Sequence, residues 1–262
     1  MDTLAIIPAY NEADKIGEVL SGIRGLDAVL DIVVIDDGST DGTAEVARRA
    51  GATVLRLSSN MGYGVAVQTA YKYAYERGYA YGVQLDADGQ HDPAYLPRIL
   101  DGVMSDEADL IIGSRFLKTQ DHQTPPANGY RAGMIRRSGI ILFAALASKL
   151  IGIKITDPTS GYRAWNRKLL AFFVQDFFPY EYPDADVIVM VHRAGFRIKE
   201  MPMVMYQRNT GASMYTGLKP LYYVFKMFFS ILMTLMRKRP SFGMPQESKD
   251  RHPEKIAQEI EK

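Results

Sequence analysis

Cysteine is absent from this sequence of 262 residues, which excludes disulfide bonds, thiol catalysis and zinc sites with cysteine ligands. The absence fits a reducing compartment. An excess of charge of one sign is lacking too, because the formal net charge is only +1. Domains that bind nucleic acid usually carry a strong basic excess, so nucleic acid is not an expected partner.

Long apolar runs are scarce as well. The run 221–236 is interrupted by a lysine, a serine and a threonine, and it is shorter than the roughly 20 apolar residues of a spanning helix. Its aromatic and Met residues, followed by cations at 237–239, are typical of a helix that lies in a membrane interface. A core helix of the same domain is the alternative. No basic segment precedes the first apolar run, 4–8, which is too short for a signal peptide, so we expect this end to stay in the cytoplasm.

The apolar residues that are present, 47% of the chain, allow a sizeable core and follow two alternating periods. Short β-branched or apolar runs predict strands at 4–8, 32–35, 53–57, 83–86 and 110–113. Helical spacing and composition predict helices at 16–23, 43–50 and 65–77. This alternation predicts an α/β fold with a mostly parallel sheet flanked by helices, in which ligands bind beyond the carboxyl ends of the strands.

The second half of the chain is less regular. We expect a loop at 117–130, a long helix with a basic start at 131–153, and a polar turn at 157–163. Residues 164–206 predict more helix and a final strand near Val204.

Three polar clusters follow predicted strands, namely Pro-Ala-Tyr-Asn-Glu at 8–12, Asp-Asp-Gly-Ser-Thr-Asp at 36–41 and Asp-Ala-Asp-Gly-Gln-His at 86–91. In an extended segment Asp86 and Asp88 point the same way, and such carboxylates suit Mg²⁺ or Mn²⁺. A cation of this kind neutralises the charge that grows on a diphosphate leaving group. An acidic turn that caps a helix is the plain alternative.

The second cluster begins with adjacent acids, Asp36 and Asp37, at the end of a strand that should be buried. Uncompensated buried carboxylates are costly, so at the rim of the sheet they are expected to meet a ligand's hydroxyl, amide or metal. Ser39, Thr40 or Asp41 could cap the next helix, and Asn11 in the first cluster could cap the helix before it.

These three clusters, in this order and spacing, resemble glycosyltransferase family 2, and more closely its polyprenyl-phosphate sugar synthase branch. Gly113-Ser114-Arg115 and Asp-Pro-Thr-Ser-Gly-Tyr-Arg at 157–163 also look like that branch, and the resemblance runs from about residue 3 to 210. It implies a GT-A-like (Rossmann-like) fold, a divalent metal and inversion at the anomeric carbon. The implied reaction moves a hexose from a UDP- or GDP-sugar to a polyprenyl-phosphate acceptor.

The resemblance also assigns roles by position. The residues implied at the nucleotide base and ribose are Pro8, Tyr10, Glu12 and Asp37. Those implied at the Mg²⁺ or Mn²⁺ ion and the diphosphate are Asp86, Asp88 and Gln90. The acceptor phosphate would be held by Arg115 together with Arg137, or with Arg136 or Arg131 in its place. Guanidinium groups bind phosphate bidentately, whereas a surface ion pair or a solvated helix face would explain the same arginines plainly.

Other functions are distinguished by specific residues. Transfer to a sugar hydroxyl would need a general base, for which Asp184 or Asp186 is the candidate, although acids at a helix start also favour the helix dipole. A non-catalytic nucleotide-sugar module is disfavoured by the intact acids and Arg115. A nucleotidyltransferase would need a Gly-rich phosphate loop after the first strand, and 8–12 offers none. His91 is read as a metal ligand or a surface hydrogen-bonding residue, and 208–213 as a lid or a connector.

We therefore expect a catalytic domain at 1–215, a membrane-associating helical segment at 216–239 and a polar tail at 240–262. The expected partners are a nucleotide-sugar donor, a lipid-phosphate acceptor and a membrane surface. A small membrane protein or a second copy of the chain is expected to help hold it at the lipid. The expected location is the cytoplasmic face of a membrane, as a peripheral protein.

Overall fold

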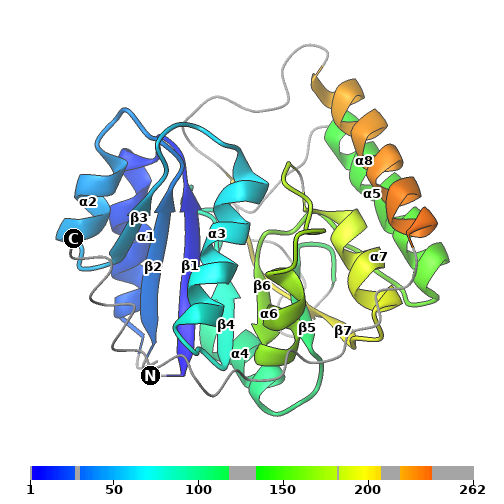
Figure 1. The fold of residues 1–262 in the computed structure, drawn as a ribbon, viewed down its shortest axis with the longest axis horizontal. Coiled ribbons are helices and arrows are strands. Elements are labelled where there is room, and N and C mark those ends of the chain that lie inside the picture. Colours follow the sequence, from blue (N-terminus) through cyan, green and yellow to red (C-terminus); the bar gives the residue numbers. More distant parts are fainter. Residues whose placement is uncertain (1, 27–29, 118–133, 182, 208–218, 238–262) are drawn as a thin grey trace.

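A single seven-stranded sheet forms the centre of the computed structural model, with helices on both of its faces (Figure 1). The structure describes residues 2–26, 30–117, 134–181, 183–207 and 219–237, and for 134–136 and 219–221 it describes the backbone only. The strands are β1 (Thr3–Ala9), β2 (Asp31–Asp36), β3 (Thr53–Arg56), β4 (Tyr81–Gln84), β5 (Leu110–Ser114), β6 (Arg163–Asn166) and β7 (Ile198–Pro202). The α-helices are α1 (Ala13–Arg24), α2 (Thr43–Arg49), α3 (Tyr63–Glu76), α4 (Leu96–Met104), α5 (Met134–Ile151), α6 (Arg167–Phe173), α7 (Ala185–Arg193) and α8 (Lys219–Met236), and a 3-10 turn, η1, spans Pro93–Tyr95.

The sheet order is β3-β2-β1-β4-β6-β5-β7. All pairings are parallel except those of β6, which runs antiparallel to both β4 and β5, so the predicted mostly parallel sheet is confirmed. Strand β6 itself was not predicted, because sequence reading placed a polar turn and then helix there. It has four residues, all buried, and so short a segment has no periodicity that would distinguish strand from helix.

Side chains of the central strands alternate between the two faces and build a core on each. Leu4 and Ile6 of β1 join the core beneath α3, α6 and α7, whereas Ala5 and Ile7 join the core beneath α1 and α4. The predicted apolar face of α1 is buried. These two cores hold the carboxyl ends of β1, β2, β4 and β5 in fixed relative positions, which places the polar clusters together.

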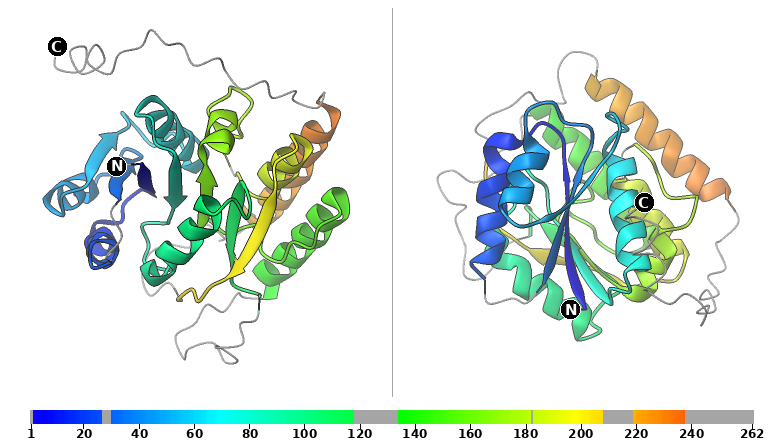
Figure 2. Two further views of the ribbon diagram at one scale, coloured as in Figure 1. Left: turned by 90° about the horizontal axis from the view of Figure 1, so that it is seen from below. Right: turned by 60° about the vertical axis from the view of Figure 1, so that its left-hand side comes forward.

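Helix α8 lies beside α5 and α7 at the far end of the sheet from β3, as two views show (Figure 1, Figure 2). One row of α8, Tyr223, Met227 and Ile231, is buried in a small cluster with Phe143 of α5 and Ala185 of α7. The opposite row is exposed, with Phe225 69% and Phe229 56% accessible. The helix is therefore a core helix on one face and an open apolar surface on the other. None of the helices within the described ranges is long and apolar enough to cross a membrane.

Candidate functional site

A small cavity of about 40 Å³ lies beyond the carboxyl ends of β4 and β5. Its lining residues are Asp86, Gln90, His91, Arg115, Thr159, Ser160, Gly161 and Met205. The structure thus brings together Asp86, Gln90 and Arg115, which are distant in sequence. A carboxylate can hold a divalent cation, and a guanidinium can hold a phosphate group, so the two side chains at this small space suit ligands of both kinds.

The Asp86 carboxylate is oriented from beneath by a chain of buried hydrogen bonds. Tyr71 donates its hydroxyl proton to Gln84 Oε1 at 2.9 Å, and Gln84 Nε2 donates to the Tyr63 oxygen at 2.7 Å. Tyr63 in turn donates to Asp86 Oδ1 at 3.0 Å. Burial, reinforced by the charge of Asp86, raises the pKa of Tyr63 well above its usual value, so Tyr63 remains a donor. These hydrogen bonds favour one orientation of the Asp86 carboxylate.

Gly161 provides the space in which this carboxylate lies. A Cβ atom at Gly161 would lie 2.8 Å from both Asp86 oxygens and 2.9 Å from the Tyr63 oxygen, so Gly161→Ala must displace them. We expect it to lower kcat/KM on the order of 10- to 100-fold with a nearly unchanged melting temperature. Gly139→Ala on α5, where an added Cβ meets nothing within 4 Å, is the matched control. Equal activity of the two variants would show that the orientation of Asp86 is unimportant.

His91 is buried, contrary to the reading of a surface residue. Its Nδ1 accepts a hydrogen bond from the Asp86 backbone N–H at 3.0 Å, and its Nε2 lies 3.6 Å from Asp86 Oδ2. The ring stacks on Tyr162 with centroids 5.0 Å apart. Burial lowers the pKa of His91 to about 4, so the imidazole is neutral at pH 7 and carries its proton on Nε2. It shapes the loop that carries Asp86.

Asp88 and Gln90 complete the loop. Asp88 is half-buried, accepts from the Gln90 backbone N–H at 3.0 Å through Oδ1, and does not line the cavity. Gln90 Nε2 donates to the Tyr206 carbonyl at 3.0 Å, and the Tyr206 N–H donates to the Gln90 carbonyl at 2.8 Å. The residues that follow β7 therefore hold this loop in place.

The donor set of this loop fits a hard divalent cation. Asp86, Asp88 and Gln90 offer carboxylate and amide oxygens, and Mg²⁺ is usually held by one or two carboxylates together with substrate phosphates. Within the described part of the chain no group of three or more His, Asp or Glu residues is placed to hold a metal.

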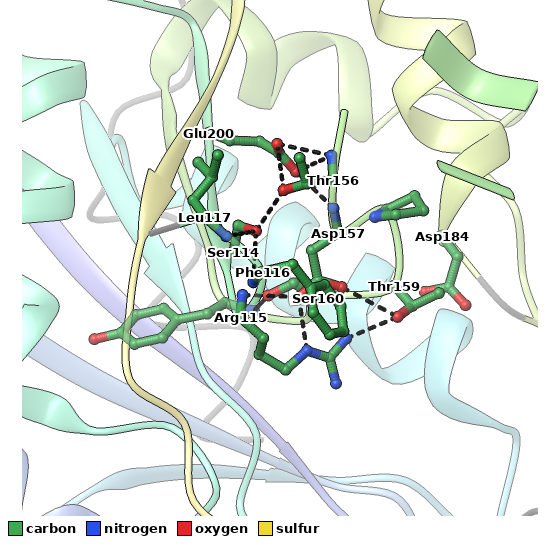
Figure 3. A network of polar contacts seen from close by, with 12 residues as sticks. Ser114, Arg115, Phe116, Leu117, Thr156, Asp157, Thr159, Ser160, Asp184 and Glu200 are labelled. Atoms are coloured by element: carbon green, nitrogen blue, oxygen red, sulfur yellow. Dashed lines mark hydrogen bonds and ion pairs between the residues drawn. The ribbon is translucent and has the colours of Figure 1, made fainter. Parts of the chain in front are cut away.

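Arg115 is held by a buried carboxylate (Figure 3). Its Nε and Nη2 donate to Asp157 Oδ2 and Oδ1, each at 2.6 Å, and Nη2 also donates to Thr159 Oγ1 at 2.8 Å. The Arg115 side chain is 7% exposed and that of Asp157 is fully buried, so the plain alternative of a surface ion pair does not apply. The pair fixes the guanidinium plane at the edge of the cavity.

The segment that carries Asp157 is anchored by Glu200 of β7. The Glu200 carboxylate accepts from the backbone N–H groups of Thr156 and Asp157 and from the Thr156 hydroxyl, all at 2.8 to 2.9 Å. Sequence reasoning missed Glu200, Tyr63 and the role of Asp157. Asp157 stood in a recognised motif, but its partner Arg115 lies 42 residues away and no local spacing signals the pair.

At the predicted nucleotide side, the first two clusters are linked to each other. Asn11 has a left-handed φ of 54°; its N–H donates to Ser39 Oγ and its side-chain oxygen accepts from the Thr40 N–H. Pro8 is buried in β1, whereas Tyr10 is exposed and Glu12 is half-buried. The N-cap residues of α1 and α2 are Glu12 and Gly42, so Asn11 does not cap α1. The Asp41 carboxylate accepts first-turn N–H groups, from Thr43 of α2 and from Ala13 of α1, each at 3.1 Å, which bears out the expected capping of α2.

The adjacent acids of the second cluster are compensated within the protein. Asp36 is fully buried, accepts from the Ser39 N–H at 3.0 Å and lies 3.2 Å from Arg56 Nε. Asp37 accepts from the N–H groups of Met61 and Gly62 at 2.7 and 2.9 Å. Each carboxylate oxygen has two lone pairs, so these bonds orient Asp37 and leave acceptor capacity.

Asp184 and Asp186 lie at the start of α7. Asp186 is 1% exposed; its Oδ1 accepts from the N–H groups of Asp184 and Val187, and its Oδ2 pairs with the Ser230 hydroxyl. Asp184 Oδ2 accepts from the Tyr223 hydroxyl, and its Oδ1 lies 4.0 Å from Arg163 Nη2. Burial raises the pKa of Asp184, and it raises that of Asp186 to about 6. Neither side chain lines the cavity.

Of the other arginines proposed for the acceptor, the structure describes the side chain of Arg137. Arg137 is exposed near the start of α5 and does not line the cavity. For Arg136 the structure describes only the backbone, and Arg131 lies outside the described residues. The predicted loop after residue 117, the lid or connector at 208–213 and the tail at 240–262 lie outside them too.

Comparison with known proteins agrees with this geometry. The model of "Glycosyl transferase family 2" matches residues 4–172. An undecaprenyl-phosphate mannosyltransferase of Micrococcus luteus is 33% identical, with 83% of this chain and 88% of that protein covered. A dolichyl-phosphate hexose transferase of Haloferax volcanii is 34% identical, with 80% and 85% covered.

A solved structure shares the fold. Glucosyl-3-phosphoglycerate synthase of Mycobacterium tuberculosis, crystallised with Mn²⁺, UDP and phosphoglyceric acid, superposes with a TM-score of 0.66 at 21% identity. The match covers 92% of this chain and 81% of that one. The GT-A fold expected from the sequence is therefore confirmed. Together with the family match over most of the chain, these findings show that the protein belongs to glycosyl transferase family 2.

Proposed function

We propose that this chain transfers a hexose from a UDP- or GDP-sugar to a polyprenyl phosphate at a membrane surface, with a divalent cation and with inversion. The observation that carries the proposal is the cavity in which Asp86 and Gln90 face the buried, oriented guanidinium of Arg115. Related proteins support the acceptor class, since they include an undecaprenyl-phosphate mannosyltransferase and a polyprenol monophosphomannose synthase. Their donors need not be the donor used here.

In this proposal each residue has a limited task. Asp86, Asp88 and Gln90 would hold the cation, which when bound would neutralise charge on the leaving diphosphate. Arg115, fixed by Asp157, orients the acceptor phosphate so that one of its oxygens attacks the anomeric carbon from the face opposite the diphosphate. The new carbon–oxygen bond forms as the bond to the diphosphate breaks. The acceptor phosphate is already ionised near pH 7, so no general base is needed.

The experiment that tests the function measures transfer of labelled hexose into the lipid phase. The chain is incubated with vesicles that contain polyprenyl phosphate, with each UDP- and GDP-hexose in turn, and with Mn²⁺ or EDTA. Transfer to the lipid phosphate that is lost with EDTA is expected. Transfer to a glycolipid or polysaccharide hydroxyl, with none to the phosphate, would overturn the proposal in favour of a hydroxyl-directed transferase.

The variant Asp186→Asn distinguishes a phosphate acceptor from a hydroxyl acceptor. Asn at this position keeps an oxygen for the backbone N–H groups and offers an N–H to Ser230. The Asp186 carboxyl has a pKa of about 6 in the folded chain and the ordinary value of 3.8 in the unfolded chain. Between these two values the folded chain binds more protons than the unfolded chain, so the free energy of unfolding falls as the pH rises from 3.8 to about 6. Above pH 6 it stays at the lower value.

Asp186→Asn should therefore be more stable than the parent at pH 7, by up to about 3 kcal/mol, and equally stable near pH 4. Denaturant unfolding at the two pH values checks this. Transfer activity should survive, because no base is required. Loss of nearly all turnover with intact donor binding would instead identify Asp186 as the base for a hydroxyl acceptor.

The exposed row of α8 supports placement at a lipid surface. Phe225 and Phe229 are more than half exposed on a helix that the cation Arg237 follows, a composition that suits the membrane interface. Phe225→Ser with Phe229→Ser should weaken flotation with anionic vesicles roughly 10- to 100-fold, as expected when two aromatic side chains no longer enter lipid. Met104→Ser on α4, also exposed, is the control. Undiminished flotation of the double variant would refute this role.

A further inference from the structure

The inward face of α8 carries three polar side chains in register with three acids. Tyr223, Lys226 and Ser230 recur at the spacing of one helix face. Each meets an acid at the start of α7 or just before it: Tyr223 donates to Asp184, Lys226 pairs with Glu181, and Ser230 pairs with Asp186.

These contacts lie within an otherwise apolar interface. The same face of α8 buries Met227 and Ile231 against Phe143 and Ala185. Apolar packing alone tolerates small rotations and shifts of a helix, whereas hydrogen bonds to largely buried carboxylates require one register. The two pairs at Asp184 and Asp186 therefore fix where α8 lies relative to the start of α7, and the partly exposed Lys226–Glu181 pair adds to them.

The same acids adjoin the wall of the cavity. The Pro183 carbonyl accepts from Arg163 Nη1 at 2.7 Å, and Asp184 Oδ1 lies 4.0 Å from Arg163 Nη2. Arg163 also donates to the carbonyls of Ser160 and Pro158, in the segment that lines the cavity. A continuous set of buried contacts thus runs from Tyr223 through Asp184 and Arg163 to the cavity.

We propose that Tyr223 and Ser230 of α8 are positioning residues for the reaction site, so that docking of the outward apolar face on lipid stabilises the cavity geometry needed for transfer. The measurement of kcat for this proposal rests on the proposed function, whereas the measurement of amide hydrogen exchange does not. Whatever binds α8 in its packed position favours the contacts at Asp184 and Asp186, because only differential binding shifts such an equilibrium. The coupling is reciprocal, so an occupied site also favours docking.

The test compares Tyr223→Phe with Thr234→Val, which removes a hydroxyl of the same helix that is not among the three contacts. The measurements are kcat and KM with vesicle-embedded polyprenyl phosphate, flotation with phosphatidylglycerol–phosphatidylcholine vesicles, and amide hydrogen exchange in the segment 183–187, in which Pro183 has no amide hydrogen. For Tyr223→Phe we expect kcat to fall roughly 10-fold, as for one lost hydrogen bond to a charged group, with unchanged flotation and faster exchange. Vesicles should slow exchange at 183–187 in the parent. Thr234→Val should match the parent throughout.

The outcomes separate the two proposals. If the parent transfers no hexose to lipid phosphate, the proposed function fails, and the exchange measurements alone decide the coupling. Unchanged exchange at 183–187 in Tyr223→Phe, or no effect of vesicles on the parent, overturns the coupling. A loss of flotation that accounts for the whole loss of kcat overturns it as well, because Tyr223 would then serve docking only. If Tyr223→Phe does not fold, Ser230→Ala is judged by the same criteria.

Discussion

Asp86→Asn is expected to lower the rate of hexose transfer by roughly 10²- to 10³-fold, the usual cost of removing one group that stabilises charge in a transition state. The substitution preserves the shape of the side chain and its hydrogen bond from Tyr63 while removing the charge that faces the cavity. The loss should appear in kcat/KM for the donor, and Mn²⁺ should be needed at higher concentration. The melting temperature should change little, because the carboxylate is only half-buried.

Asp101→Asn on the exposed surface of α4 is the matched control and should retain full activity. Circular dichroism and thermal unfolding of both variants show whether each is folded. Retention of more than about a tenth of the parental rate by Asp86→Asn would contradict a charge-stabilising role of this size. The metal dependence of the parent, measured in parallel, indicates whether the lost charge acted through a cation.

Asp157→Ala is expected to lower the free energy of unfolding by about 3–5 kcal/mol, the usual effect of removing one partner of a buried ion pair. The variant leaves the Arg115 guanidinium, which is 7% exposed, without the carboxylate that accepts two of its N–H groups. In a protein of this size each kcal/mol lowers the melting temperature by roughly 2–4 °C. The variant should therefore melt well below the parent and should also transfer hexose slowly.

A double variant separates the structural part of this pair from its functional part. Arg115→Met with Asp157→Leu replaces both charges by apolar groups, and such replacements are often neutral for stability. We expect denaturant unfolding of the double variant to recover most of the lost stability while transfer activity stays absent. Recovery of activity together with stability would show that Arg115 serves the fold alone, and that the acceptor phosphate is held elsewhere.

Local sequence patterns account for most of the fold. The strands around Ile6, Val34 and Ile111 and the helix that buries Leu20 were predicted because their apolar periods span several residues and are read without knowing the partners. The carboxyl ends of parallel strands share one edge of a sheet, so the position of Asp86 and Arg115 beyond that edge also followed from the mostly parallel sheet that was predicted. Strand β6 was not predicted, because a segment of four buried residues shows no alternation of apolar and polar side chains.

What the sequence alone determined is therefore the part of the sheet formed by β1 to β5, its ligand-binding edge and the residue types that collect there, since each depends on short-range periodicity and on motifs read in order. The tertiary structure alone decided the partners of those residues: Arg115 with Asp157, Asp36 with Arg56 and Tyr223 with Asp184. It also decided that α8 is buried on one face and exposed on the other. The physical reason is that such pairs are distant along the chain and close only after packing, while burial, which sets their energies and their pKa values, is a property of the folded molecule.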